Sequence, residues 1–160
     1  MKVYHGSSLI VDKPNVSFSR QNLDFGKGFY VTSYQAQAER WAKRKALRTG
    51  SVPIISVYEL NENHEDFRVL RFAEDNEAWV EFVCDCRKGK DAYLQYDIII
   101  GSVADDRVYT AVDMYYRGIW DIERTLSELK YYEMNDQICI IKQHFIDAQL
   151  SFLDSYEVIS

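Results

Sequence analysis

The alternation of hydrophobic and polar positions divides the chain into short strands and amphipathic helices. Runs of β-branched and aromatic residues predict strands over residues 29–32, 53–60, 96–100 and 137–142, with shorter extended pieces over 2–4, 68–72 and 156–159. Apolar residues at helical spacing predict helices between Ser33 and Gly50 and over residues 76–87, 109–117, 121–131 and 145–153. Because the strands do not alternate regularly with the helices, the pattern predicts an α+β fold. The 160 residues are expected to form one domain, residues 1–160.

Composition narrows the possible classes of function. The formal net charge of −6 argues against binding to a nucleic acid backbone but leaves open a nucleotide pocket with a few positive residues. The three cysteines, Cys84, Cys86 and Cys139, lack zinc-ligand spacing, so we expect no metal site and reduced thiols. No apolar run approaches the length of a membrane span, and we therefore expect a cytoplasmic protein with no membrane partner.

The most informative stretch runs from Asp24 to Thr32, with the sequence Asp-Phe-Gly-Lys-Gly-Phe-Tyr-Val-Thr. Its two glycines, Gly26 and Gly28, permit positive φ angles and a close approach of another group to the main chain. Such a loop is either a structural bend or a turn that faces a ligand. The neighbouring sequences Tyr4-His5-Gly6-Ser7 and Asn135–Ile140 favour the ligand-facing turn.

Three residues, His5, Tyr30 and Gln137, fall on predicted strands or at their ends. With their neighbours they resemble the ADP-ribosyltransferase superfamily, on the His-Tyr-Glu branch that includes poly(ADP-ribose) polymerases and diphtheria-type toxins. Tyr4-His5-Gly6-Ser7 resembles the first motif of that branch, and Phe25–Tyr30 resembles the second, Phe-Gly-Lys-Gly-aliphatic-Tyr. At the third motif, Gln137 stands where the branch has Glu. The chain also resembles, over nearly its whole length, a small bacterial domain family of unknown function assigned to this superfamily.

The resemblance implies a split, strongly twisted β-sheet core with flanking helices and NAD as co-substrate in a cleft. It implies that His5 hydrogen-bonds a ribose hydroxyl and that the Gly6 backbone meets the nicotinamide carboxamide. Tyr30 would stack on the nicotinamide ring, and Trp41 would cover its other face. Ala38 stands where the superfamily has a nicotinamide-contacting Ser, so the amide contact is expected to be weaker or made differently.

Four further residues are candidates for contact with NAD: Ser7, Arg20, Lys27 and Gly28. Arg20 and Lys27 flank the predicted cleft and could meet the pyrophosphate. Arg20 is the better candidate because its fork of donors matches phosphate oxygens. The structural alternatives stay open, with Tyr30 and Trp41 as core aromatics and the two cations as solvated charges.

The chemistry of the implied reaction explains the aromatic and hydrogen-bonding residues of the predicted site. It also calls for a carboxylate, and at that position this sequence has Gln137. Breaking the bond to nicotinamide generates a ribose with oxocarbenium character, whose positive charge a carboxylate would stabilise. Gln137 can hydrogen-bond a hydroxyl but carries no charge. Asp136 is adjacent but points to the opposite face of a strand, and Glu133 could be recruited from a predicted loop. His5, Tyr30 and Gln137 are the predicted catalytic residues.

The sequence therefore predicts a mono-ADP-ribosyltransferase that acts on a macromolecular acceptor, either a protein or a nucleic acid. The resemblance implies a bacterial toxin-like effector restrained by a small neutralising partner protein. One alternative is a binding module for NAD or ADP-ribose, favoured by Gln137. Another is a relative of the RNA 2′-phosphotransferases, which need extra basic residues. The basic residues from Lys43 to Arg48 are interpreted as a solvated helix face instead.

Overall fold

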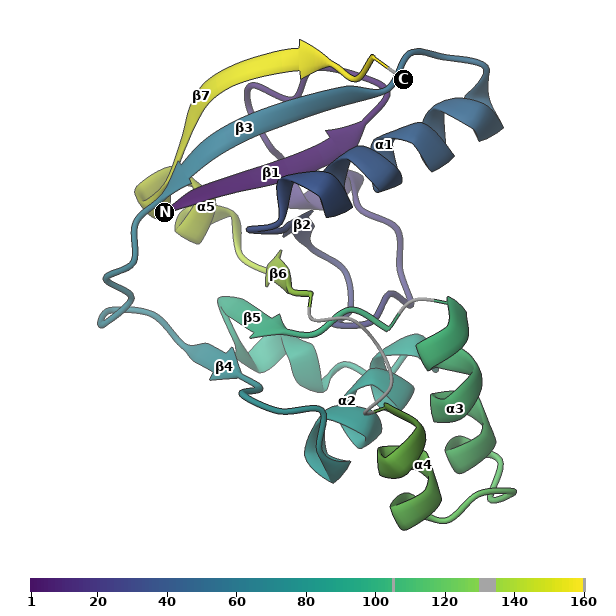
Figure 1. Ribbon diagram of the computed structural model, residues 1–160. Coiled ribbons are helices and arrows are strands. Elements are labelled where there is room, and N and C mark those ends of the chain that lie inside the picture. The colour runs from purple at the N-terminus through teal and green to yellow at the C-terminus, as the bar shows by residue number, and fades with distance from the viewer. Residues whose placement is uncertain (105, 130–134, 160) are drawn as a thin grey trace.

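The computed structural model describes residues 1–104, 106–129 and 135–159 and arranges them as two β-sheets with helices on the outside (Figure 1). The strands are β1 (Lys2–Ser7), β2 (Phe29–Val31), β3 (Ile54–Leu60), β4 (Val69–Arg71), β5 (Ile98–Gly101), β6 (Gln137–Ile140) and β7 (Leu150–Glu157). The helices are α1 (Gln35–Thr49), α2 (Glu77–Arg87), α3 (Asp106–Tyr116), α4 (Ile122–Leu129) and α5 (Gln143–Gln149), with short 3-10 turns η1 (Val16–Phe18) and η2 (Ala92–Gln95). The predicted α+β class is confirmed.

The two sheets share no named strand. The first has the order β1-β3-β7 and is antiparallel throughout. The second has the order β2-β6-β5-β4, in which only the β4–β5 pair is parallel. The predicted division of the sheet into two parts is therefore present, with the β1-β3-β7 sheet at the top of Figure 1 and helices α2, α3 and α4 gathered at the opposite end.

An isolated β-bridge joins the two sheets between Tyr4 on β1 and Thr32, the residue that follows β2. The Tyr4 N–H donates to Thr32 O at 2.8 Å, and the Thr32 N–H donates to Tyr4 O at 3.0 Å. Because these are main-chain bonds, β1 and β2 are held side by side at this point whatever their side chains. The bridge brings the first two sequence motifs together.

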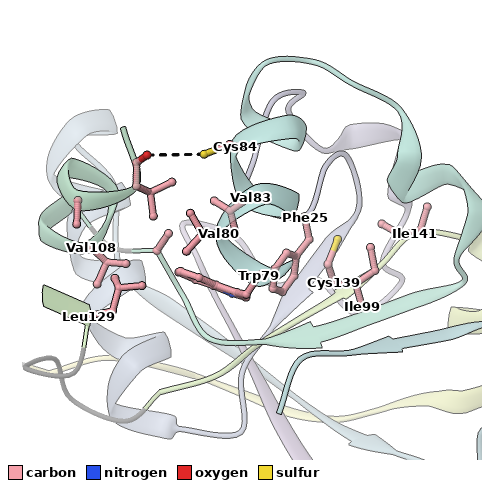
Figure 2. Close-up of a cluster of buried hydrophobic side chains, with 13 residues drawn as sticks. Phe25, Trp79, Val80, Val83, Cys84, Ile99, Val108, Leu129, Cys139 and Ile141 are labelled. Atoms are coloured by element: carbon pink, nitrogen blue, oxygen red, sulfur yellow. Dashed lines mark hydrogen bonds between the residues drawn. The ribbon is translucent and has the colours of Figure 1, made fainter. Parts of the chain in front are cut away.

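Alternating side chains along the strands place one hydrophobic cluster on each face of the second sheet. The cluster between the two sheets contains Val3, Phe29, Val31, Tyr58, Leu60, Ile98, Ile138, Ile140, Phe145 and Ile146. The opposite face packs under α2, α3 and α4. Figure 2 shows this second cluster, in which Phe25 and Trp79 lie beside Ile99 and Cys139.

Helix α1 covers the outer face of the first sheet. Ala38 and Ala42 of α1 are fully buried and pack with Ile55 and Val57 of β3. The helix ends at Gly50, whose φ of 64° is the left-handed conformation of a helix C-cap. Small residues on this face of α1 allow it to lie directly on β1.

Two sequence predictions about element boundaries were wrong. The helix predicted over residues 145–153 ends at Gln149, and strand β7 begins at Leu150 because its main chain pairs with β3. Ser33 does not cap α1. The N-cap is Tyr34, and Ser33 instead donates to the Asp136 carboxylate from both its N–H and its hydroxyl.

Candidate functional site

His5 lies in the middle of β1, where the first sheet meets β2. Its Nδ1 is 2.7 Å from Tyr30 O, and its ring centroid is 4.5 Å from that of Phe29. A carbonyl oxygen only accepts hydrogen bonds, so Nδ1 carries the proton in this contact. The neutral ring is therefore left with Nε2 as an acceptor for a hydroxyl donor.

The surroundings of His5 keep it neutral. Burial, opposed by the hydrogen bond to Tyr30 and assisted by the positive charge of Lys45, lowers the pKa of His5 to about 4. At neutral pH the imidazole is thus a hydrogen-bonding group and not a cation. In this state the ring can accept a hydrogen bond at Nε2 from a hydroxyl or amide donor.

Gly6 is required by the contact between β1 and α1. A Cβ at this position would be 2.9 Å from Ala42 N and would overlap Ala38 O, and both are main-chain atoms that cannot rotate away. Ser7, the last residue of β1, is buried next to it. The close packing of the first motif on α1 thus gives Gly6 a structural role that is independent of any ligand.

One face of α1 carries an aromatic and two basic residues. Trp41, Lys45 and Arg48 follow at spacings of four and three residues and so share that face. Trp41 is half-buried and belongs to none of the hydrophobic clusters formed by the described residues. Desolvation, followed by the positive charges of Arg20 and Arg48, lowers the pKa of Lys45.

The basic residues in the second half of α1, Lys43, Arg44, Lys45 and Arg48, are all exposed, as expected of a solvated helix face. Lys45 also interacts electrostatically with Arg20 of the loop between β1 and β2, with Arg48 and with His5. Lys45 was not predicted as a site residue, although its spacing of four residues from Trp41 places the two side chains on one helix face.

Tyr30 lies on the face of the second sheet away from His5. Its ring packs against the cluster under α2, whereas the adjacent Phe29 faces the first sheet and His5. Its hydroxyl donates to Gly26 O at 2.6 Å and accepts from the Phe25 N–H at 3.0 Å. His5 therefore meets Tyr30 through the main chain, and the Tyr30 hydroxyl holds the glycine loop in place.

The second glycine of the loop permits a close approach to β6. A Cβ at Gly28 would lie 2.5 Å from Cys139 Sγ and 2.6 Å from Ile140 O. The Gly28 N–H donates to Ser19 Oγ at 3.1 Å, which ties the segment before Arg20 to the glycine loop. Lys27, between the two glycines, is half-buried.

Gln137 begins β6 and is 4% exposed. Its Nε2 donates to Asp24 Oδ2 at 2.9 Å and to Ser102 O at 3.1 Å. The preceding residue, Asp136, points the other way and accepts from Thr32 Oγ1 at 2.6 Å, as the alternation along a strand predicts. Glu133, the other carboxylate considered for this site, lies outside the described residues.

Asp24 is the centre of a buried polar network that the sequence did not reveal. Its carboxylate accepts from Arg87 Nε at 2.6 Å, the Ala104 N–H at 2.9 Å and Gln137 Nε2. Arg87 Nη2 also pairs with Asp24 and donates to Ala104 O at 2.9 Å, and its guanidinium lies 3.8 Å from the centre of the Tyr109 ring. We call Asp24, Arg87, Ala104 and Gln137 the Asp24 hub.

Other features of the described residues lie apart from these candidates. A pocket of about 410 Å³ near α2 and α3 is lined by Glu81, Cys84, Asp85, Tyr115, Tyr116, Gly118 and Trp120, none of them a predicted site residue. In residues 1–104, 106–129 and 135–159, no group of three or more His, Cys, Asp or Glu could hold a metal ion. No helix in these ranges is long and apolar enough to cross a membrane.

Residues 1–152 match the protein family described as protein of unknown function (DUF3990). No curated protein matches the chain at a significant level.

Proposed function

The chain belongs to the DUF3990 family, and we propose that it is an NAD-dependent mono-ADP-ribosyltransferase. In the proposed reaction the bond between nicotinamide and ribose breaks, and the bond electrons leave with nicotinamide. A nucleophilic atom of a macromolecular acceptor then bonds to the ribose carbon and releases its proton. NAD is the co-substrate of this reaction, and no metal takes part in it.

The observation that carries this proposal is the environment of His5. A neutral imidazole with a fixed tautomer lies beside Gly6, at the bridge between two sheets. The positive charges of Arg20 and Arg48 lower the pKa of Lys45, so the three basic residues form a cluster. The charge of Lys45 in turn lowers the pKa of His5. A hydroxyl acceptor next to a cluster of cations suits a ligand with a ribose and a pyrophosphate.

Trp41 supports the same proposal from α1. A half-buried tryptophan outside the hydrophobic clusters offers a flat apolar face near the cations Lys45 and Arg48. Such a face would stack on a planar ring and clamp it during bond cleavage. Tyr30 is the weaker candidate for stacking because its ring packs with the α2 cluster and its hydroxyl is engaged by the glycine loop.

The test is release of nicotinamide from NAD in the presence of bacterial proteins and nucleic acids as acceptors. The wild type should release nicotinamide, and His5→Ala and Trp41→Ala should each reduce the rate at least about tenfold, the loss expected for one hydrogen bond or stacking contact made in the transition state. Trp120→Ala is the matched control, because Trp120 is also half-buried but lies at the α2–α3 pocket. If the wild type releases nicotinamide no faster than the background rate without protein, the proposal is wrong.

A second candidate function is a binding module for NAD or ADP-ribose that does not turn over. It is favoured by Gln137, a neutral residue whose Nε2 is already bound by Asp24 and Ser102. NAD at about one hundred times its Kd should stabilise either kind of protein by about 2.7 kcal/mol. Thermal stabilisation by NAD with no release of nicotinamide would select the binding module.

A further inference from the structure

Helix α1 carries a concentration of positive charge on the outside of the molecule (Figure 1). Five of the 19 lysines and arginines of the chain lie within nine consecutive residues, and that segment contains no aspartate or glutamate. All five are exposed: Arg40, Lys43, Arg44, Lys45 and Arg48. We call these five residues the basic face of α1.

The charges of the basic face are not neutralised within the fold. Among the residues that the structure describes, none of the five side chains has an ion pair or a hydrogen bond. The acid that precedes them, Glu39, accepts from Gln35 Nε2 at 3.3 Å and from the Tyr156 hydroxyl at 2.9 Å. Like charges three and four residues apart repel each other on a helix, so this arrangement costs stability in the free protein. An anionic partner would remove that cost.

The spacing of the arginines suits a chain of phosphates. Arg40, Arg44 and Arg48 recur every four residues, so they follow one another at steps of about 6 Å along the helix axis. Lys43 and Lys45 lie on either side of this row, because each is one residue from Arg44. Each guanidinium presents a fork of donors that matches two phosphate oxygens. The basic face thus offers several phosphate contacts in succession.

Other anionic partners fit this surface less well. A helix that lies in a membrane surface inserts an apolar face, but Ala38 and Ala42 already pack on the first sheet and Leu47 is the one aliphatic residue among the exposed positions of α1. Protein interfaces are depleted in lysine, whereas surfaces that bind nucleic acids are much more positively charged. The charge and the spacing together favour a nucleic acid.

We propose that the basic face of α1 binds the phosphodiester backbone of a nucleic acid. The net charge of −6 does not prevent this binding, because screening at physiological ionic strength limits the reach of distant charges to about 8 Å. Lys45 of the basic face also interacts electrostatically with His5, so a nucleic acid on α1 lies near the proposed reaction site.

The bound nucleic acid is then the acceptor of the proposed reaction, and this role rests on the proposed function. A nucleophilic oxygen or nitrogen of the nucleic acid bonds to the ribose carbon and releases its proton to solvent. The electrons of the broken bond leave with nicotinamide. Binding by the basic face itself does not depend on this reaction.

The experiment measures binding without NAD, by fluorescence anisotropy of labelled probes of about 20 nucleotides, which is longer than such a site needs. The probes are single-stranded RNA, single-stranded DNA and double-stranded DNA. The test variant combines Arg40→Gln, Lys43→Gln and Arg44→Gln, three residues outside the predicted contacts with NAD. Glutamine has nearly the helix propensity of lysine and arginine, so α1 should stay folded, which circular dichroism checks.

The matched control combines Lys13→Gln, Arg68→Gln and Arg71→Gln. These residues are also exposed, and they lie in the loop after β1 and in or beside β4. The control therefore makes the same change in net charge outside α1. A general effect of net charge would weaken binding equally in both variants.

The wild type should bind at least one probe with a Kd of about 1–100 μM at physiological salt, the range of contacts made to the backbone alone. The test variant should bind at least about tenfold more weakly. Its plot of log affinity against log salt should be less steep by about 2 for a single strand, since each phosphate contact contributes about 0.7. The control should stay within about threefold of the wild type. No binding of any probe by the wild type, or equal losses in the two variants, overturns the inference.

A competitor distinguishes a nucleic acid from an acidic protein. Poly-L-glutamate at the same concentration of charge should displace the probe less effectively than the unlabelled nucleic acid, because it lacks the contacts of sugars and bases. Equal displacement by the two competitors would assign the basic face to an acidic protein and overturn the proposal.

The acceptor role is tested separately with NAD that carries a radioactive phosphate next to the adenosine. The label should move to the probe with the wild type and the control, and at least about tenfold more slowly with the test variant when the probe is below its Kd. If the wild type releases nicotinamide but labels only proteins, the acceptor role is wrong. If the wild type releases no nicotinamide at all, the proposed function fails, and the binding measured without NAD still decides whether the basic face holds a nucleic acid.

Discussion

At the scale of single residues, His5 and Tyr30 show how the partners of a polar side chain decide what it can still bind. His5 donates from Nδ1 to a main-chain carbonyl, which leaves one acceptor nitrogen. Tyr30 uses its hydroxyl twice, on Gly26 O and the Phe25 N–H, and burial raises its pKa well above the ordinary value. His5 thus keeps a group for a ligand, whereas the Tyr30 hydroxyl is used by the fold.

The depressed pKa of His5 predicts a loss of stability in mild acid. Because the folded pKa of about 4 lies below the unfolded value of 6.5, the unfolded chain binds more protons between these values. The contribution of His5 is fully present above pH 6.5 and decreases as the pH falls toward 4, by about 3 kcal/mol in total for a shift of this size.

The measurement is urea denaturation of wild type and His5→Asn at several pH values from 4 to 7. Asn keeps a side-chain N–H for Tyr30 O but does not titrate. The free-energy difference between the two proteins should therefore shrink as the pH falls. A difference that stays constant over this range would show that His5 is not buried in its neutral form.

Tyr30→Phe tests whether the hydroxyl holds the glycine loop. The substitution keeps the ring but leaves Gly26 O and the Phe25 N–H without this partner, which should cost about 1–3 kcal/mol of unfolding free energy. Tyr116→Phe, at a side chain that is 44% exposed, is the control and should change stability by less than about 0.5 kcal/mol. Equal losses of stability in the two variants would show that the Tyr30 hydroxyl does not stabilise the glycine loop.

At the scale of secondary structure elements, the contact of α1 with β1 fixes how far the basic residues of α1 lie from His5. Gly6 on β1 and the small residues Ala38 and Ala42 on α1 allow the two backbones to meet. Lys45 follows Ala42 by three residues on α1, and its positive charge acts on His5. The distance between the two elements is thus a property on which the candidate site depends.

Gly6→Ala should separate α1 from β1, because the new Cβ meets main-chain atoms of Ala38 and Ala42 that have no alternative rotamer. We expect a loss of about 3 kcal/mol or more, at the upper end for overpacking. Gly118→Ala is the control, since nothing lies within 4 Å and only its φ of 75° is strained, at about 1–2 kcal/mol. Chemical denaturation of both variants checks the prediction, and a smaller loss for Gly6→Ala than for Gly118→Ala would contradict it.

At the scale of the whole molecule, the net charge is negative but positive residues are concentrated near His5. The chain carries a formal charge of −6, yet Arg20, Lys45 and Arg48 act on one another close to His5. An anionic ligand would therefore be repelled by the molecule as a whole and attracted at this one place. That attraction should be sensitive to salt, because much of the cluster is exposed to solvent.

Lys45→Gln should raise the Kd for NAD about three- to tenfold at low ionic strength, and the effect should shrink as salt is added. Lys43→Gln makes the same charge change two positions away on the same helix, on a different face, and should leave the Kd within about twofold. Fluorescence titration with NAD at two salt concentrations measures both variants. Equal effects of the two substitutions would indicate a general charge effect and no local site.

The sequence by itself determined the class of fold and most elements, because local hydrophobic periodicity decides them. The helix α1, its end at Gly50 and the buried strand β5 were all predicted from such patterns. The end of α5 was not predictable, because Leu150 joins β7 through main-chain bonds to β3, about 90 residues earlier in the chain. Hydrophobic periodicity predicts secondary structure least well where pairing with a distant strand overrides the helical spacing of apolar residues.

Only the tertiary structure decided how the candidate residues are used. The partners of Asp24 lie 63 residues away at Arg87 and 113 residues away at Gln137, and no spacing along the chain indicates them. The sequence predicted Gln137 as a site residue but did not indicate its partners. The fold shows that its amide donates to the Asp24 carboxylate of the glycine loop and to Ser102 O, because strand pairing and helix packing bring these distant residues together.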